Sequence, residues 1–259
     1  MQALVLMIQF MTRYPVPMTV DFTAGHFVRG MKWMPLVGLL VALPAAGGFL
    51  LADWLLGREI AAIAAVILLI GVTGGLHLDG LADSADGLFS YRSRERMLEI
   101  MRDSALGVNG VIAVVLAILL KYLLLRSIAT DGAVPAVLVA PVVARMALVW
   151  HSASARYARE ERGIGDFVNQ TGWIQACSAT LSSLVLVGGI LFFCGVRPSA
   201  VPWLTLIFHL PPIALATGFA AYVNRRLGGI TGDTIGASIE LSEQLCLFIG
   251  LLVWKYWLT

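Results

Sequence analysis

Charged residues are scarce in this chain. They make up 13% of its 259 residues, against about 25% in soluble domains. The chain has no basic tail and no acidic block, and its formal net charge is only +2, so nothing indicates a nucleic-acid partner. Its three cysteines lie far apart in apolar segments and form no CxxC pair. This spacing argues against a disulfide framework and against a cysteine metal site.

Long apolar runs are abundant, and several reach the roughly 17–25 residues that span a bilayer as a helix. Seven spans are predicted, at 35–56, 60–78, 108–125, 134–151, 174–196, 201–223 and 242–258. The apolar run before Pro15 and Pro17 has no preceding positive charge, so it predicts an interfacial helix rather than a signal peptide. We therefore expect one domain, residues 1–259. It would be an all-α, polytopic membrane helix bundle with about seven transmembrane helices and short amphipathic helices on the cytoplasmic face.

The basic residues are distributed unequally between the two ends of these spans. Alternation of the spans puts the N-terminal segment and three polar connections, 79–107, 152–173 and 224–241, on one face. That face carries 12 Lys and Arg residues and the opposite face carries 4. The positive-inside rule then predicts that the richer face is cytoplasmic. We expect the chain to lie in the cytoplasmic (inner) membrane, with its active site on the cytoplasmic face. Most acidic residues of the chain share this face, which indicates a polar site there.

Three aspartates, Asp79, Asp83 and Asp86, stand within eight residues that contain no Lys or Arg. Their spacings of four and three residues place them on one helical face. Carboxylates one turn apart can share a metal ion, so the cluster could hold one ion and supply a base, or hold two ions. Mg²⁺ is the natural occupant because it binds carboxylate, water and phosphate oxygens. The alternative is a solvated helix end. His77 is read first as a packed or helix-end histidine.

Two further polar stretches could contact phosphate. The first, 90–110, contains Arg92, Arg94, Arg96 and Arg102, whose planar side chains suit phosphate oxygens, followed by Asp103. Its apolar positions predict a short amphipathic helix, and lipid headgroups are the alternative partners of Arg94 and Arg96.

The second polar stretch, 224–244, contains a glycine-rich loop. Asp233 and Glu240 in this stretch could complete a second side of a phosphate site, although Asp233 could equally cap the last helix. Inside the spans, Arg145 is expected to face the bundle and Lys121 to extend toward the membrane surface.

Four stretches together resemble the cobalamin synthase family, the adenosylcobinamide-GDP ribazoletransferases. They are FMTRYPVP at 10–17, GGLHLDGLADSADG at 74–87, MLEIMRDSALGVNG at 97–110 and GGITGDTIGA at 228–237. They follow the family's order over nearly the whole chain. The resemblance implies a membrane-embedded, Mg²⁺-dependent transferase that joins adenosylcobinamide-GDP to α-ribazole, or to α-ribazole 5′-phosphate, and releases GMP.

Carried onto this sequence, the resemblance makes Asp79, Asp83 and Asp86 the metal-binding acids. It assigns Arg102 and Asp103 to the family's second motif and Asp233 to the third. We predict catalytic roles for Asp86, Asp103, Arg102 and Arg92. Substrate contacts are predicted for Arg13, His77, Asn109, Arg145, Arg225, Gly232, Asp233 and Glu240.

The chain departs from the family pattern at a few positions. Ser84 stands where the family usually has Thr, and Arg102 stands where it commonly has Lys. Ala105 and Leu106 replace a basic residue and Ile, which removes a phosphate contact from that position.

Two alternative functions compete with this interpretation. A CDP-alcohol-type phosphotransferase also has aspartates separated by small residues on a membrane helix, but Ser84 and Ala85 replace its usual Ala-Arg pair. A cation-coupled transporter would place its acids near the bilayer midplane at broken helices, whereas these acids are predicted at one face. Self-association and contacts with other cobalamin-assembly enzymes are left open.

Overall fold

The helical class predicted from the sequence is confirmed. The structure, a computed structural model, describes residues 1–159 and 164–257, and no strand is present in that part of the chain. The helices in chain order are α1 (Gln2–Met11), α2 (Ala24–Gly30), the short 3-10 helix η1 (Met31–Trp33), α3 (Met34–Leu56), α4 (Arg58–Thr73), α5 (Leu76–Leu88), α6 (Arg94–Ile100), α7 (Val108–Ser127), α8 (Thr130–Ser154), α9 (Ile164–Val168), α10 (Trp173–Phe193), α11 (Val201–Leu227) and α12 (Gly232–Tyr256).

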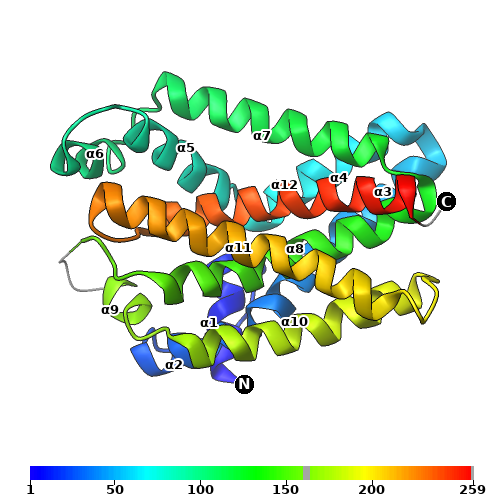
Figure 1. Ribbon diagram of the computed structural model, residues 1–259, viewed down its shortest axis with the longest axis horizontal. Coiled ribbons are helices and arrows are strands. Elements are labelled where there is room, and N and C mark those ends of the chain that lie inside the picture. The colour runs from blue at the N-terminus through cyan, green and yellow to red at the C-terminus, as the bar shows by residue number, and fades with distance from the viewer. Residues whose placement is uncertain (160–163, 258–259) are drawn as a thin grey trace.

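The long helices run roughly along the long axis of the molecule (Figure 1). Six helices or continuous helix runs in the described residues are long and apolar enough to cross a membrane, and the bent pair α4 and α5 would make a seventh. The outer faces of α7 and α10 expose large apolar side chains such as Leu116 and Val185. Because water would penalise such faces and lipid would not, the architecture fits a polytopic membrane protein.

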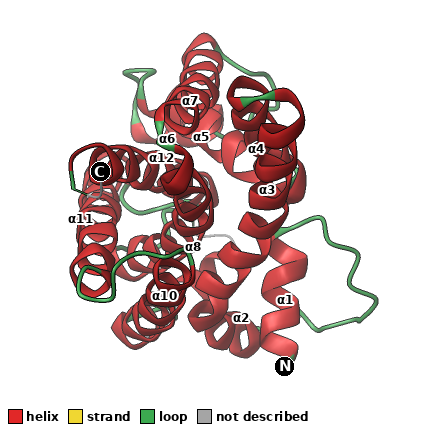
Figure 2. Cartoon of the chain, turned by 90° about the vertical axis from the view of Figure 1, so that its right-hand side faces the viewer, coloured by secondary structure: helices red, strands yellow, loops and turns green. Residues whose placement is uncertain are grey.

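Helix α8 lies at the centre of the bundle, with α3, α10 and α12 around it (Figure 2). Its apolar side chains are almost all buried, and residues with small side chains let neighbouring helices approach closely. At Gly38 of α3, for example, a Cβ atom would lie 2.8 Å from the Cα atom of Val142 in α8. A side chain at this position would therefore push the two helices apart.

The prediction that the three longer polar connections share one face is confirmed. The α5–α7 connection with α6, the α8–α10 connection with α9, and the α11–α12 turn lie together at one end, which we call the loop end (left in Figure 1). The tight turn at Gly57, the connections at 128–129 and 194–200, and the last turn of α12 lie at the other end.

Two predicted span boundaries are wrong. The predicted span 60–78 is not one helix, because α4 ends at Thr73 and α5 begins at Leu76 after a bend of 88°. The last helix begins at Gly232 rather than at 242, with Thr231 as its N-cap. The acids Asp233, Glu240 and Glu243 therefore lie inside this helix, and each has a basic partner elsewhere in the chain. The predicted end of this span at 258 lies outside the described residues.

Candidate active site

Helix α5 carries the aspartate cluster, and the two glycines that precede α5 set its direction toward the loop end. Gly74 and Gly75 have φ angles of 65° and 76°, a left-handed conformation that glycine adopts without a steric cost. The predicted contact residue Arg13 lies over this break, with its side chain against Gly74 and its backbone N–H donating to the carbonyl of Val72. Because of the 88° bend, α5 does not continue in the direction of α4.

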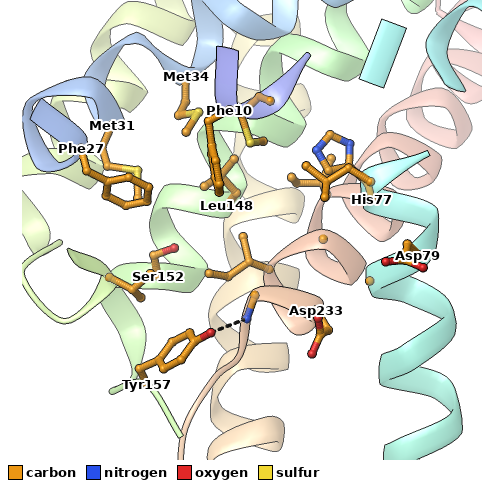
Figure 3. A pocket seen from close by; sticks show the side chains of 18 of the residues that line it. Phe10, Phe27, Met31, Met34, His77, Asp79, Leu148, Ser152, Tyr157 and Asp233 are labelled. Carbon is orange, nitrogen blue, oxygen red and sulfur yellow. Dashed lines mark hydrogen bonds between the residues drawn. The ribbon is translucent and has the colours of Figure 1, made fainter. Parts of the chain in front are cut away.

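A close crossing joins α5 to the start of α12. A Cβ atom at Gly80 would lie 2.7 Å from the carbonyl oxygen of Asp233. On the α12 side, a Cβ atom at Gly236 would lie 3.4 Å from the Cα atom of Gly80. Since neither glycine has a side chain, the backbones meet, and Asp79 is brought next to Asp233 (Figure 3).

Three carboxylates and one guanidinium gather at this crossing. Asp79 is exposed and Asp83 is half-buried. Asp233 is half-buried as well; its Oδ2 accepts hydrogen bonds from Arg159 at 3.0 Å and from the hydroxyl of Thr231 at 3.3 Å. The charges of Asp79 and Asp233 repel that of Asp83, and Arg159 offsets them in part. The cluster therefore has an excess of negative charge that suits a cation.

Sequence reasoning did not assign Arg159 to the site. It lies in the α8–α10 connection, and its Nε is buried without a hydrogen-bond partner among the described residues. The available signal was its place in one of the three polar connections on the acid-rich face. No spacing rule links residue 159 to residue 233, so only the tertiary structure could pair them.

Asp86 has a different environment from Asp79 and Asp83. Its two carboxylate oxygens accept hydrogen bonds from the backbone N–H groups of Gly107, at 2.7 Å, and Gly110, at 2.9 Å. It thereby caps the N-terminus of α7, whose partial positive charge favours a carboxylate. The structure does not bring the three predicted metal ligands together at one point, because Asp86 faces α7.

We expect Asp86→Asn to destabilise the protein more than it weakens metal binding. An amide offers one acceptor oxygen, so one buried N–H of α7 would lose its partner, at a cost of about 1–3 kcal/mol. Thermal unfolding in detergent without divalent ions measures this loss. Asp103→Asn is the control, because Asp103 is exposed and accepts a turn hydrogen bond from Ala105 rather than capping a buried helix. Unchanged stability together with weakened Mg²⁺ binding would favour the ligand role instead.

A cavity of about 290 Å³ opens beside the acids. Side chains from α1, α2, η1 and α8 form its apolar wall, including Phe10, Phe27, Met31 and Leu148. In Figure 3 the acids Asp79 and Asp233 lie on the side of the cavity away from Phe27 and Met31. The backbone N–H of Gly232 donates to the hydroxyl of Tyr157. The cavity thus combines an apolar interior with a charged rim.

Behind the cavity lies a buried network of charged side chains from α7, α8 and α12, joined by His77 of α5. Lys121 lies 2.8 Å from Glu240 and also contacts Glu243, and Arg145 pairs with Glu243. Arg145 also hydrogen-bonds His77 Nδ1 at 3.3 Å. The prediction that Lys121 extends outward is wrong, since its side chain is 3% exposed. Arg145 faces the bundle as predicted.

This network changes the interpretation of two predicted substrate contacts. Glu240 and Arg145 do not line the cavity, and both are committed to buried ion pairs. The sequence placed Glu240 near Asp233 by helical period, but α12 carries it deeper into the bundle, where Lys121 is its partner. His77 is buried as its packed interpretation predicts, and it lines the cavity as a substrate contact would.

The remaining predicted residues lie at the loop end without lining this cavity. Arg92, Asn109 and Arg225 are exposed, and so are Arg102 and Asp103. Arg94, by contrast, donates to the carbonyl oxygens of Leu227 and Ala158 and so fixes α6 against the rest of the loop end. The catalytic roles of Arg92, Arg102 and Asp103 and the substrate contacts of Asn109 and Arg225 stay predictions.

Among residues 1–159 and 164–257, no three His, Cys, Asp or Glu side chains are arranged to hold a metal ion by themselves. Asp79 and Asp83, one turn apart on α5, nevertheless offer two carboxylates beside Asp233. Mg²⁺ is commonly bound by one or two carboxylates, with waters and substrate phosphates completing its coordination. The donor set therefore fits Mg²⁺ and lacks the sulfur or imidazole ligands that favour Zn²⁺.

Comparison with known proteins finds matches over almost the whole chain. The model of a family described as cobalamin-5-phosphate synthase matches residues 3–251. A protein of Acetivibrio thermocellus is 38% identical over 260 residues, which cover 96% of this chain and 97% of the relative. One of Fusobacterium nucleatum is 37% identical over 275 residues, 98% of each chain. One of Listeria monocytogenes is 34% identical over 255 residues, 98% of this chain and 99% of the relative. All three are named adenosylcobinamide-GDP ribazoletransferase. No solved structure matches.

Proposed function

Since the chain belongs to the cobalamin-5-phosphate synthase family, we propose that it is an adenosylcobinamide-GDP ribazoletransferase. It would join adenosylcobinamide-GDP to α-ribazole, or to its 5′-phosphate, with release of GMP. The observation that carries this proposal is the extent of the family match, residues 3–251, which includes every element of the site. The acid cluster beside an apolar cavity supports it, because one substrate brings a pyrophosphate and the other an aromatic base.

Asp79 and Asp83 would hold Mg²⁺ in this proposal. The ion would supply positive charge to the pyrophosphate oxygens, which is most of what phosphoryl transfer requires from an enzyme. The three neighbouring carboxylates would otherwise repel an anionic substrate, so the reaction should need the divalent ion.

The chain's own residues would position the reacting groups. Arg159 has guanidinium nitrogens beyond the one that binds Asp233, and they can donate to phosphate oxygens. Asp233 has its Oδ2 held by Arg159 and Thr231, which leaves Oδ1 available as a proton acceptor. The ribose hydroxyl oxygen of α-ribazole would attack the phosphorus next to cobinamide as its proton passes to Asp233. The P–O bond to GMP would break, with GMP leaving as the anion.

The loop end would face the cytoplasm, and the protein would lie in the inner membrane. The 12-to-4 distribution of basic residues supports this orientation through the positive-inside rule. The active site would then open toward the compartment that holds nucleotides.

Family membership also separates this function from the alternatives. Both a CDP-alcohol phosphotransferase and a cation-coupled transporter would belong to other families. The decisive test is an assay of the purified protein in detergent with Mg²⁺ and adenosylcobinamide-GDP. GMP should appear only when α-ribazole is added, together with the cobalamin product. Equal GMP release without α-ribazole would contradict the proposal.

Arg159 provides a sharper test of the site. We expect Arg159→Ala to lower kcat/KM by roughly 10²-fold, because a guanidinium that stabilises developing charge typically contributes an effect of this size. Arg159→Lys should recover part of the activity, since the charge remains but the planar donor pair is lost. Arg156→Ala is the matched control, an exposed arginine of the same connection. Wild-type kcat/KM in Arg159→Ala would show that Arg159 has no part in the reaction.

A further inference from the structure

Two buried polar groups on the cavity wall have no partner among the described residues. One is the hydroxyl of Ser152 on α8, and the other is Nε2 of His77 on α5. The two residues are only 2% and 3% exposed. A buried polar group without a hydrogen bond costs free energy, and such a group commonly has a ligand or an ordered water as its partner. Ser152 and His77 therefore point to a ligand with polar atoms.

The contact with Arg145 determines what His77 can offer. Arg145 Nη2 lies 3.3 Å from His77 Nδ1, and a guanidinium group can only donate hydrogen bonds. Nδ1 must therefore accept, which makes the ring neutral and leaves the hydrogen on Nε2. The charged network behind the cavity thus fixes His77 as an N–H donor. Ser152 adds a hydroxyl that can also donate.

The rest of the cavity wall suits a flat apolar ring. Phe10 and Phe27 contribute aromatic faces, with ring centroids 5.9 Å apart, and Met31, Met34 and Leu148 complete the wall (Figure 3). The thioether groups of methionine make favourable contacts with aromatic rings. The polar rim of Asp79, Asp233 and Tyr157 lies away from this wall.

The size of the cavity determines which of the two substrates of the proposed reaction can enter it. Its volume of about 290 Å³ is at the small end of the roughly 300–1,000 Å³ found for ligand pockets. A benzimidazole nucleoside fits such a space, whereas a corrinoid macrocycle with a nucleotide attached is far too large for it.

Building on the proposed function, we propose that this cavity is the binding site of α-ribazole, which enters with its base first. The base lies among Phe27, Met31 and Leu148, and its unsubstituted ring nitrogen accepts a hydrogen bond from the hydroxyl of Ser152. The N–H of His77 donates to another polar atom of the nucleoside. The ribose then lies at the rim beside Asp233, which can take the proton of its hydroxyl. Adenosylcobinamide-GDP stays outside the cavity and presents only its pyrophosphate to the acids.

The test is equilibrium binding of α-ribazole to the detergent-purified full chain, without adenosylcobinamide-GDP and without divalent ions. Ser152→Ala should raise the Kd for α-ribazole about fivefold, the effect of losing one ordinary hydrogen bond. Leu148→Trp, which fills the cavity, should raise the Kd more than about tenfold. The Kd for adenosylcobinamide-GDP should change less than about twofold in both variants.

Matched controls are available for both substitutions. Ser238→Ala removes another buried hydroxyl without a partner, outside the cavity, and Leu119→Trp adds a ring on the exposed face of α7. Both controls should bind α-ribazole as the wild type does. If Leu148→Trp does not fold, the Kd of Ser152→Ala for α-ribazole is the only test of the assignment.

Two outcomes would overturn this assignment: no binding of α-ribazole to the wild type, or an unchanged Kd in Ser152→Ala, joined by an unchanged Kd in Leu148→Trp wherever that variant folds. Tight binding of α-ribazole without any GMP release would leave the assignment in place and overturn the proposed function.

Discussion

Asp83→Asn should lower kcat/KM for GMP release by roughly 10²–10³-fold, a loss typical of removing a group that stabilises the transition state. Asp83 is half-buried one helical turn from Asp79, and the charges of Asp79 and Asp233 act on it. Asparagine has the same shape but no charge, so the substitution removes attraction for a cation without creating a cavity. The measurement is the rate of GMP release as a function of Mg²⁺ concentration.

The Mg²⁺ dependence separates a metal ligand from a structural carboxylate. The variant should need more Mg²⁺ than the wild type and should stay slow at saturation. Asp131→Asn, an exposed aspartate at the opposite end of the bundle, is the matched control and should react normally. Near-normal turnover of Asp83→Asn at saturating Mg²⁺ would remove Asp83 from the metal site.

Glu243→Gln should reduce the free energy of unfolding by about 3–5 kcal/mol, the usual result of removing one partner of a buried ion pair. Glu243 contacts both Lys121 and Arg145, whose side chains are 3% and 1% exposed. Without its charge, the two bases share a single carboxylate, Glu240, in the interior of the bundle. The measurement is thermal or chemical unfolding of the purified protein in detergent.

A double substitution tests whether charge balance is the cause of this loss. Arg145→Met combined with Glu243→Gln leaves Lys121 paired with Glu240, so the double variant should be more stable than Glu243→Gln alone. Glu59→Gln is the control, because its ion pair with Arg126 is exposed, and it should unfold like the wild type. A Glu243→Gln variant as stable as the wild type would show that the network does not stabilise the fold.

The acid-rich face shows what the local sequence pattern can predict and what it cannot. The spacing of Asp79 and Asp83 on one helical face could be predicted because helical period depends only on neighbouring residues. The same reasoning placed Asp86 with them, yet Asp86 binds the backbone of α7 at Gly107 and Gly110. Nothing in the local pattern distinguishes a carboxylate that caps a distant helix from one that faces a ligand.

Arg159 and Lys121 show the same limit for basic residues. Arg159 was one of 12 basic residues on its face, and its pairing with Asp233 spans 74 residues of sequence. Lys121 has a side chain long enough to reach the membrane surface, and the sequence does not reveal that Glu240 and Glu243 lie beside it. Whether such a basic side chain faces outward or pairs with an acid inside the protein depends on which helices are neighbours.

The helical membrane class, the end of the bundle that carries the polar connections and the segments that supply the acids could all be predicted from the sequence, because hydropathy, span length and helical period are properties of contiguous residues. The tertiary structure alone decided which charged groups face the cavity and which neutralise one another inside the bundle. It also decided that the cavity exists, because its walls come from α1, α2, η1, α3, α5, α8, α9 and α12. The physical reason is that burial and charge pairing depend on distances between helices, which no single stretch of chain contains.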